Sequence, residues 1–128
     1  MIHHIDLPVV DVERSRAFYE RVLAPLALSL VIHNRHPNGH EVLGFGRLPD
    51  PVFWIRNGRP AIGLLHVAFA APTRAAVRAF HAAGLLAGGT CNGPPGLRPR
   101  YADDYYAAFM VDPDGHNIEA VCRLSVSG

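Results

Sequence analysis

The segments HHIDLPVVDVERSRAFYERVLA, residues 3–24, and LLHVAFAAPTRAAVRAFHAAGLL, residues 64–86, repeat one pattern within the same chain. His4 and His66 lie 62 residues apart, and an Arg-Ala-Phe triplet recurs at that offset. Each segment opens with a short apolar stretch that predicts a strand and continues with an apolar period that predicts an amphipathic helix. The repeat therefore predicts two copies of one structural unit.

Both predicted helices begin at a residue that is favourable as an N-cap. Asp11 and Thr73 stand opposite each other in the repeat, and the side-chain oxygen of either residue can accept a hydrogen bond from a free backbone N–H of the first turn. The positions that recur near helical spacing are Val12, Ser15, Tyr19 and Val22 in the first helix and Val77, Phe80 and Gly84 in the second.

Extended segments separated by turn residues follow each helix. Those after the first helix are residues 27–33, 40–46 and 51–57, and those after the second are residues 105–111 and 116–122, preceded by a Gly/Pro-rich loop at 87–99. The pattern predicts an α+β fold in which two βαβββ modules form a curved mixed-sheet cup.

We expect one domain over residues 1–128, with module one at about 1–58, module two at about 59–128 and a short join near 56–60.

Composition excludes several classes of function. The chain has 128 residues, 49% hydrophobic and 18% charged, with a net charge of +1. It has no apolar run of membrane-spanning length and no basic stripe for a phosphate backbone, so we expect neither a membrane nor a nucleic acid as partner. Cys91 and Cys122, without a recognisable secretory signal, favour a reduced cytoplasmic protein.

Successive side chains of a strand point to opposite faces of the sheet, so position along the strand predicts the face on which each candidate ligand lies. His4 shares a face with Asp6, opposite the apolar Leu7, and His66 occupies the equivalent face of the repeated strand. Glu119 lies on the face of the last strand opposite Ile118. If the sheets form a cup, two imidazoles and a carboxylate can converge there as a 2-His-1-carboxylate metal site, which leaves coordination positions open.

Simpler interpretations stay open for these residues. His4 and His66 can be hydrogen-bonded within the sheet or exposed, and Glu119 can pair with Arg56 instead of a metal. His33, His36 and His40 span a hairpin, which favours a solvated turn, whereas His3 and His116 point away from the candidate ligands.

At these residues the chain resembles the vicinal oxygen chelate superfamily. That group includes glyoxalase I, type I extradiol dioxygenases, fosfomycin-resistance transferases and bleomycin-resistance proteins. The resemblance rests on HIDLPVVDVERSRAFYERVL, on HVAFAAP opening the second unit, on DPDGHNIE closing it, and on the doubled βαβββ pattern. It implies a metal cup whose ligands come from the first and last strands of each unit.

Three members of the superfamily differ from this chain in their metal ligands or in residues near them. Glyoxalase I uses a fourth ligand, a carboxylate at the end of the first unit, where alignment here gives Ile55 and small shifts give Trp54, Arg56 or Asn57. Fosfomycin transferases use a His, His, Glu set but carry a hydroxyl residue where this chain has Asp6. Bleomycin-resistance proteins sequester their ligand without a catalytic metal.

Extradiol dioxygenases hold ferrous iron with two His and one Glu placed as His4, His66 and Glu119 are. This chain has Phe109 where those enzymes carry a Tyr and Ala102 near the position of an upstream His. The candidates for their acid–base role are Tyr101, Tyr105 and His40.

The expected substrate contacts come from two regions. Trp54 and Phe109 can form an aromatic wall, and Asn92, Arg98 and Arg100 lie in a loop near the expected mouth, where Arg can clamp an anionic group.

We therefore expect a homodimeric metal-dependent enzyme that acts on a small molecule through Fe2+, Mn2+, Zn2+ or Ni2+. Dioxygenase-like chemistry ranks first, before glyoxalase/lyase or fosfomycin-type transfer chemistry. The alternative is a non-catalytic protein that binds a small antibiotic-like ligand. Whether the two modules pair within one chain or between subunits is open at this stage.

Overall fold

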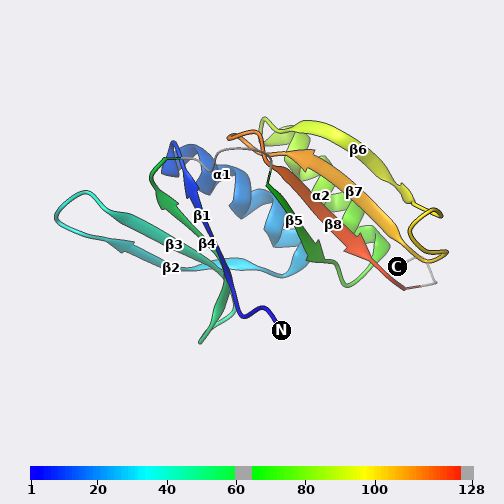
Figure 1. Ribbon diagram of the computed structural model, residues 1–128, viewed down its shortest axis with the longest axis horizontal. Coiled ribbons are helices and arrows are strands. Elements are labelled where there is room, and N and C mark those ends of the chain that lie inside the picture. Colours follow the sequence, from blue (N-terminus) through cyan, green and yellow to red (C-terminus); the bar gives the residue numbers. More distant parts are fainter. Residues whose placement is uncertain (60–64, 125–128) are drawn as a thin grey trace.

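The computed structural model describes residues 1–59 and 65–124, and the βαβββ order occurs in it twice (Figure 1). The elements of the first unit are β1 (Ile5–Val9), α1 (Val12–Leu23), a 3-10 turn η1 (Ala24–Leu26), β2 (Ser29–Arg35), β3 (Glu41–Gly46) and β4 (Pro51–Asn57). Those of the second are β5 (His66–Ala70), α2 (Arg74–Leu86), β6 (Thr90–Leu97), β7 (Tyr106–Val111) and β8 (Asn117–Cys122).

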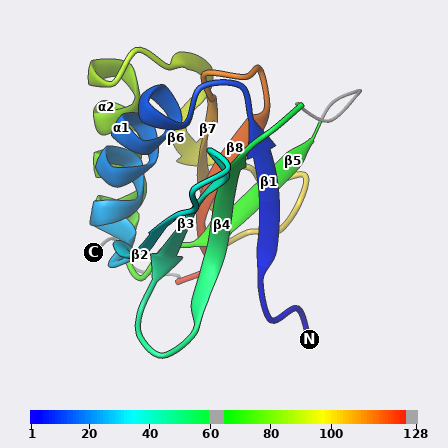
Figure 2. The same ribbon diagram turned by 90° about the vertical axis from the view of Figure 1, so that its left-hand side faces the viewer.

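Each unit forms its own four-stranded sheet, and the two sheets have equivalent strand orders. The orders are β1-β4-β3-β2 and β5-β8-β7-β6. The first strand of each unit pairs in parallel with the last, and the other pairs are antiparallel, so both sheets are mixed. Both helices lie on the same side of the sheets and contact each other (Figure 2). The predicted α+β class with two βαβββ units is confirmed.

The two helix starts are capped by the predicted residues. The Asp11 carboxylate accepts a hydrogen bond from the Arg14 N–H at 3.1 Å, and the Thr73 hydroxyl oxygen accepts one from the Ala76 N–H at 3.0 Å. Each cap satisfies a backbone donor that the helix itself cannot satisfy.

Strand alternation sorts the side chains as expected. Leu7 and Val9 of β1 are buried, as are Val67 and Phe69 of β5, whereas His66 and the other residues of its face are exposed. The buried residues form one hydrophobic cluster that extends across both units. The helix side of each sheet is therefore the core side, and the opposite faces remain for other contacts.

β6 lies where the sequence predicted only a loop. It contains Pro94 and Pro95, and its pairing with β7 shifts register on both sides of Gly93. Proline has no backbone N–H to donate. It is tolerated in an edge strand because the N–H groups on the outer side of that strand need no partner within the sheet. The order of the second sheet places β6 at such an edge, which explains the difference.

β4 ends at Asn57, within the predicted join, and Pro60 lies outside the described residues. Cys91 is exposed, Cys122 is buried, and both are free thiols. Among the helices within 1–59 and 65–124, none is long and apolar enough to cross a membrane.

The turn of residues 112–115 connects the second sheet to the helix of the first unit. Asp112 accepts hydrogen bonds from the backbone N–H groups of Asp114 and His116 and from the Tyr19 hydroxyl on α1. Asp114 accepts hydrogen bonds from Arg14 and from the N–H of Val10. Burial and the neighbouring Asp112 carboxylate raise the pKa of Tyr19 well above its usual value, so its hydroxyl is protonated and donates.

We expect Tyr19→Phe to lower the free energy of unfolding by about 1–3 kcal/mol, because Asp112 would keep a buried oxygen without its donor. Urea denaturation followed by far-UV circular dichroism measures the change. Tyr101→Phe, which removes a hydroxyl from an exposed residue, is the control. Equal stability of the two variants would contradict this role of Tyr19.

Candidate functional site

His66 and Glu119 come from the paired strands β5 and β8 and meet on the face away from the helices. Their strands run parallel, with Ala68 opposite Glu119 and His66 opposite Asn117. His66 Nε2 lies 2.8 Å from Glu119 Oε1. Both side chains line a pocket of about 390 Å³, whose other walls are Tyr101, Tyr105 and Phe109.

The Glu119 carboxylate is buried, and each of its two oxygens has a polar partner. Its side chain is 2% exposed, whereas that of His66 is 51% exposed. One oxygen meets His66, and the other accepts a hydrogen bond from the Tyr105 hydroxyl at 2.5 Å. A buried carboxylate without partners costs several kcal/mol, and these two contacts offset that cost within one chain.

Tyr105 is held in its protonated form by this environment. Burial, followed by the hydrogen bond to Glu119 and the charge of that carboxylate, raises the pKa of Tyr105 to about 12. Its ring packs edge to face on Tyr101, with centroids 5.2 Å apart, and lies under the Arg123 guanidinium. Tyr105 is therefore a fixed hydrogen-bond donor at neutral pH.

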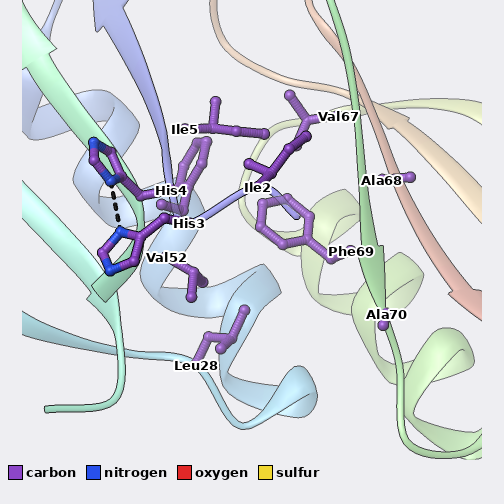
Figure 3. Close-up of a pocket in the computed structure, with 11 residues that line it drawn as sticks. Ile2, His3, His4, Ile5, Leu28, Val52, Val67, Ala68, Phe69 and Ala70 are labelled. Atoms are coloured by element: carbon purple, nitrogen blue, oxygen red, sulfur yellow. Dashed lines mark hydrogen bonds between the residues drawn. The ribbon is translucent and has the colours of Figure 1, made fainter. Parts of the chain in front are cut away.

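His4 lies in a different pocket of the same chain. It lines an apolar groove of about 350 Å³ between β1 and β5, with its Nδ1 2.9 Å from that of His3 (Figure 3). Figures 1 and 2 show that β1 and β5 run in opposite directions, so the starts of the two strands lie at opposite ends. The structure thus brings His66 and Glu119 together and places His4 apart from them.

The pair formed by His66 and Glu119 fits a divalent metal by its chemistry. An imidazole nitrogen and a carboxylate oxygen face one pocket, and such donors suit the first-row divalent metals. Within residues 1–59 and 65–124, no three His, Cys, Asp or Glu side chains gather as a metal group would require. One chain therefore supplies two of the three expected ligands at this pocket.

The position equivalent to Glu119 in the first unit is Trp54. Strand register pairs Trp54 with Asp6, just as it pairs Glu119 with Ala68, which stands 62 residues after Asp6. Alignment of the sequence put Ile55 there, one residue away. The Trp54 ring lies over Gly44, where a Cβ would come within 3.0 Å of it. An aromatic ring thus occupies the place of the fourth, carboxylate ligand expected of glyoxalase I.

Arg56 pairs with Asp6 on the same sheet rather than with Glu119. Its Nε lies 3.1 Å from Asp6 Oδ1, and a second contact joins its terminal nitrogen to the other oxygen. The alternative in which Arg56 would pair with Glu119 is therefore wrong, because Arg56 forms its ion pair with Asp6.

Phe109 lies in the pocket, and Arg98 stacks on it. The Phe109 ring is 6.0 Å from that of His66, and the Arg98 guanidinium lies 5.4 Å from the Phe109 centroid. Arg98 also donates hydrogen bonds to the carbonyls of Gly96 and Pro94, so it orders this loop. Arg100 stacks on Tyr101 at the exposed rim.

Asn92 donates a hydrogen bond to Asn117 Oδ1 at 3.1 Å. Asn117 is the residue of β8 that stands opposite His66 of β5. Asn117 was not among the predicted contacts, although it lies two residues before Glu119 in β8 and therefore on the same face of the sheet. His40 stacks loosely on His36 at the β2–β3 hairpin and lines a separate pocket there with Arg35. Of the three acid–base candidates, Tyr101 and Tyr105 line the Glu119 pocket.

Comparison with known proteins identifies the family through solved structures. No family model matches the chain, and no curated protein matches it. A glyoxalase/bleomycin resistance protein from Albidiferax ferrireducens T118 is 33% identical, over 95% of this chain and 98% of that one, with a TM-score of 0.75.

Two more distant structures share the fold. A glyoxylase/bleomycin resistance protein/dioxygenase domain from Frankia sp. EAN1pec is 19% identical over 95% of this chain and 96% of that one, with a TM-score of 0.70. Glyoxalase I from Zea mays is 22% identical over 94% of this chain, with a TM-score of 0.71, and the chain spans 45% of its length. The repeated βαβββ units and the match to the Albidiferax protein show that this chain belongs to the glyoxalase/bleomycin resistance protein family, within the vicinal oxygen chelate superfamily.

Proposed function

We propose that the chain is a metal-dependent enzyme in which a divalent metal is held by His66 and Glu119 of one protomer and by the partner subunit's His4. The observation that carries the proposal is the buried Glu119 carboxylate with His66 Nε2 at 2.8 Å, both facing an open pocket. Fe2+, Mn2+, Zn2+ and Ni2+ all accept such donors.

The separation of His4 from Glu119 supports a homodimeric site. His4 lies directly before β1 and is exposed, so it is accessible to a second chain. A twofold dimer would give each His4 the His66 and Glu119 of the other protomer, because a twofold interface repeats every contact. Two equivalent sites per dimer follow from this arrangement.

The proposed chemistry needs a small substrate with two neighbouring oxygens. A bound metal would act as a Lewis acid that stabilises the negative charge developing on those oxygens. Phe109 offers a flat apolar wall beside His66, and Tyr105 holds the Glu119 carboxylate in place. Trp54 at the place of the fourth ligand favours a three-ligand, dioxygenase-like site over the four-ligand site of glyoxalase I.

Metal-dependent thermal stability tests this proposal. The protein is stripped with a chelator, and its melting temperature is measured with and without Mn2+, Fe2+, Ni2+ and Zn2+, with Fe2+ kept anaerobic. A metal that binds only the folded state raises the melting temperature. We expect a rise with at least one of them, and no rise with any would overturn the proposal.

The second candidate is a non-catalytic binding protein, and one observation favours it. His66 and Tyr105 already satisfy both oxygens of Glu119, so the carboxylate has partners without any metal. The apolar groove of about 350 Å³ beside His4 would then receive a small apolar ligand. In that case the ligand alone should raise the melting temperature, and a chelator should leave the rise unchanged.

A further inference from the structure

We propose that Tyr105 is a positioning residue that makes Glu119 a one-oxygen ligand, an inference that rests on the proposed metal site. Its hydroxyl donates to Glu119 Oε2 at 2.5 Å. Glu119 Oε1, which faces His66 Nε2, is then the oxygen left for a metal.

The surroundings of Tyr105 keep this contact in one geometry. Its ring packs edge to face on Tyr101 and lies 5.6 Å below the Arg123 guanidinium. Arg123 is itself held by Asp104, with 2.9 Å between Nε and Oδ1. Two neighbours thus hold the phenol ring, and its hydroxyl donates to a carboxylate whose side chain is 2% exposed.

A one-oxygen carboxylate has a direct consequence for binding. A carboxylate that binds a metal through both oxygens occupies two coordination positions, whereas one held by a neighbouring donor occupies one. With Tyr105 on Oε2, Glu119 would leave an additional position free for a substrate that binds through two oxygens. Tyr105 would therefore act on substrate binding through the ligand, without touching the substrate.

Tyr105→Phe tests the inference because it removes the hydroxyl and keeps the ring. Groups that orient a metal ligand usually contribute 10–100-fold to metal affinity. We expect the Kd for Co2+, measured by calorimetry on the full dimeric protein, to rise by about that factor. We also expect the visible absorption of bound Co2+ to shift, because the coordination of Glu119 changes.

Tyr106→Phe is the matched control. Tyr106 follows Tyr105 in the chain, but it does not line the Glu119 pocket, and its hydroxyl accepts a hydrogen bond from Arg78. We expect this variant to keep the wild-type Kd and Co2+ spectrum. Melting temperatures of the two metal-free variants check that both fold.

The possible outcomes separate this inference from the metal site itself. If the wild type binds Co2+, and Tyr105→Phe has the same Kd and spectrum, the role of Tyr105 is overturned while the metal site stands. If the wild type binds neither Co2+ nor any of Mn2+, Fe2+, Ni2+ and Zn2+, both ideas fail. A loss of affinity in Tyr106→Phe equal to that in Tyr105→Phe would show a general effect of removing a tyrosine hydroxyl and would also overturn the inference.

Discussion

Glu119→Gln is expected to abolish the metal-dependent rise in melting temperature. The substitution keeps the shape of the side chain but replaces the charged carboxylate of the proposed ligand with a neutral amide. At a metal concentration of 100 times Kd, wild-type stabilisation amounts to about 2.7 kcal/mol. For a chain of this size that corresponds to a rise of roughly 10 °C, and the variant should show almost none of it.

Glu41→Gln is a close control for this experiment. Glu41 also pairs with a histidine, since its Oε2 lies 2.5 Å from His33 Nε2, but it lies on the β2–β3 hairpin outside the Glu119 pocket. We expect it to retain the full rise. A rise that survives in Glu119→Gln, or disappears in Glu41→Gln, would place the metal elsewhere.

Two defective protomers are expected to restore one metal site when they form a heterodimer. In the proposed site, His4→Ala would remove the ligand that a protomer gives to its partner, and Glu119→Ala would remove one that it keeps. In the mixed dimer, the His4→Ala protomer supplies His66 and Glu119, and the Glu119→Ala protomer supplies His4. One site is then complete, and the other lacks both residues.

Co-expression with two affinity tags and purification over both isolates this heterodimer. At a metal concentration just sufficient to saturate the wild type, we expect one metal per heterodimer, two per wild-type dimer and almost none in either parent variant. If all three ligands came from one chain, each protomer of the heterodimer would keep its own defect. A heterodimer as empty as its parents would therefore contradict the shared site.

The fold could be predicted from the sequence because the repeat and its local signals agree. Asp11 and Thr73 cap the helices as expected, and the apolar alternation of β1 and β5 assigned their core faces correctly. β6 was missed because Pro94 and Pro95 indicate a loop unless the strand is known to be an edge. The edge position of β6 follows from its pairing with β7, and a local sequence pattern carries no information about that pairing.

The site could be predicted only in part, for a geometrical reason. Alternation gives the face of a side chain but not the end of the molecule at which it lies. Alternation assigned His4 and His66 to equivalent faces. His66 lies on the exposed face of β5, whereas His4 lies directly before β1, and β1 and β5 run in opposite directions. The hydrogen bond from Tyr105 to Glu119 spans 14 residues and depends on the packing of the segment before β7.

The register of the first sheet gives the clearest indication of the reaction type. Trp54 stands where Glu119 stands in the second sheet, with Asp6 and Arg56 paired beside it. A site built from His4, His66 and Glu119 would therefore have three protein ligands and an aromatic neighbour. Such a site has room for a substrate that binds through two oxygens, in agreement with the proposed function.

A crystal structure of the metal-loaded protein, with anomalous data collected at the absorption edge of the metal, tests the central claim most directly. We predict one anomalous peak per protomer, about 2.0–2.3 Å from His66 Nε2, from Glu119 Oε1 and from an imidazole nitrogen of the partner subunit's His4. A peak at the β2–β3 hairpin beside His36 and His40, or none beside Glu119, would contradict it.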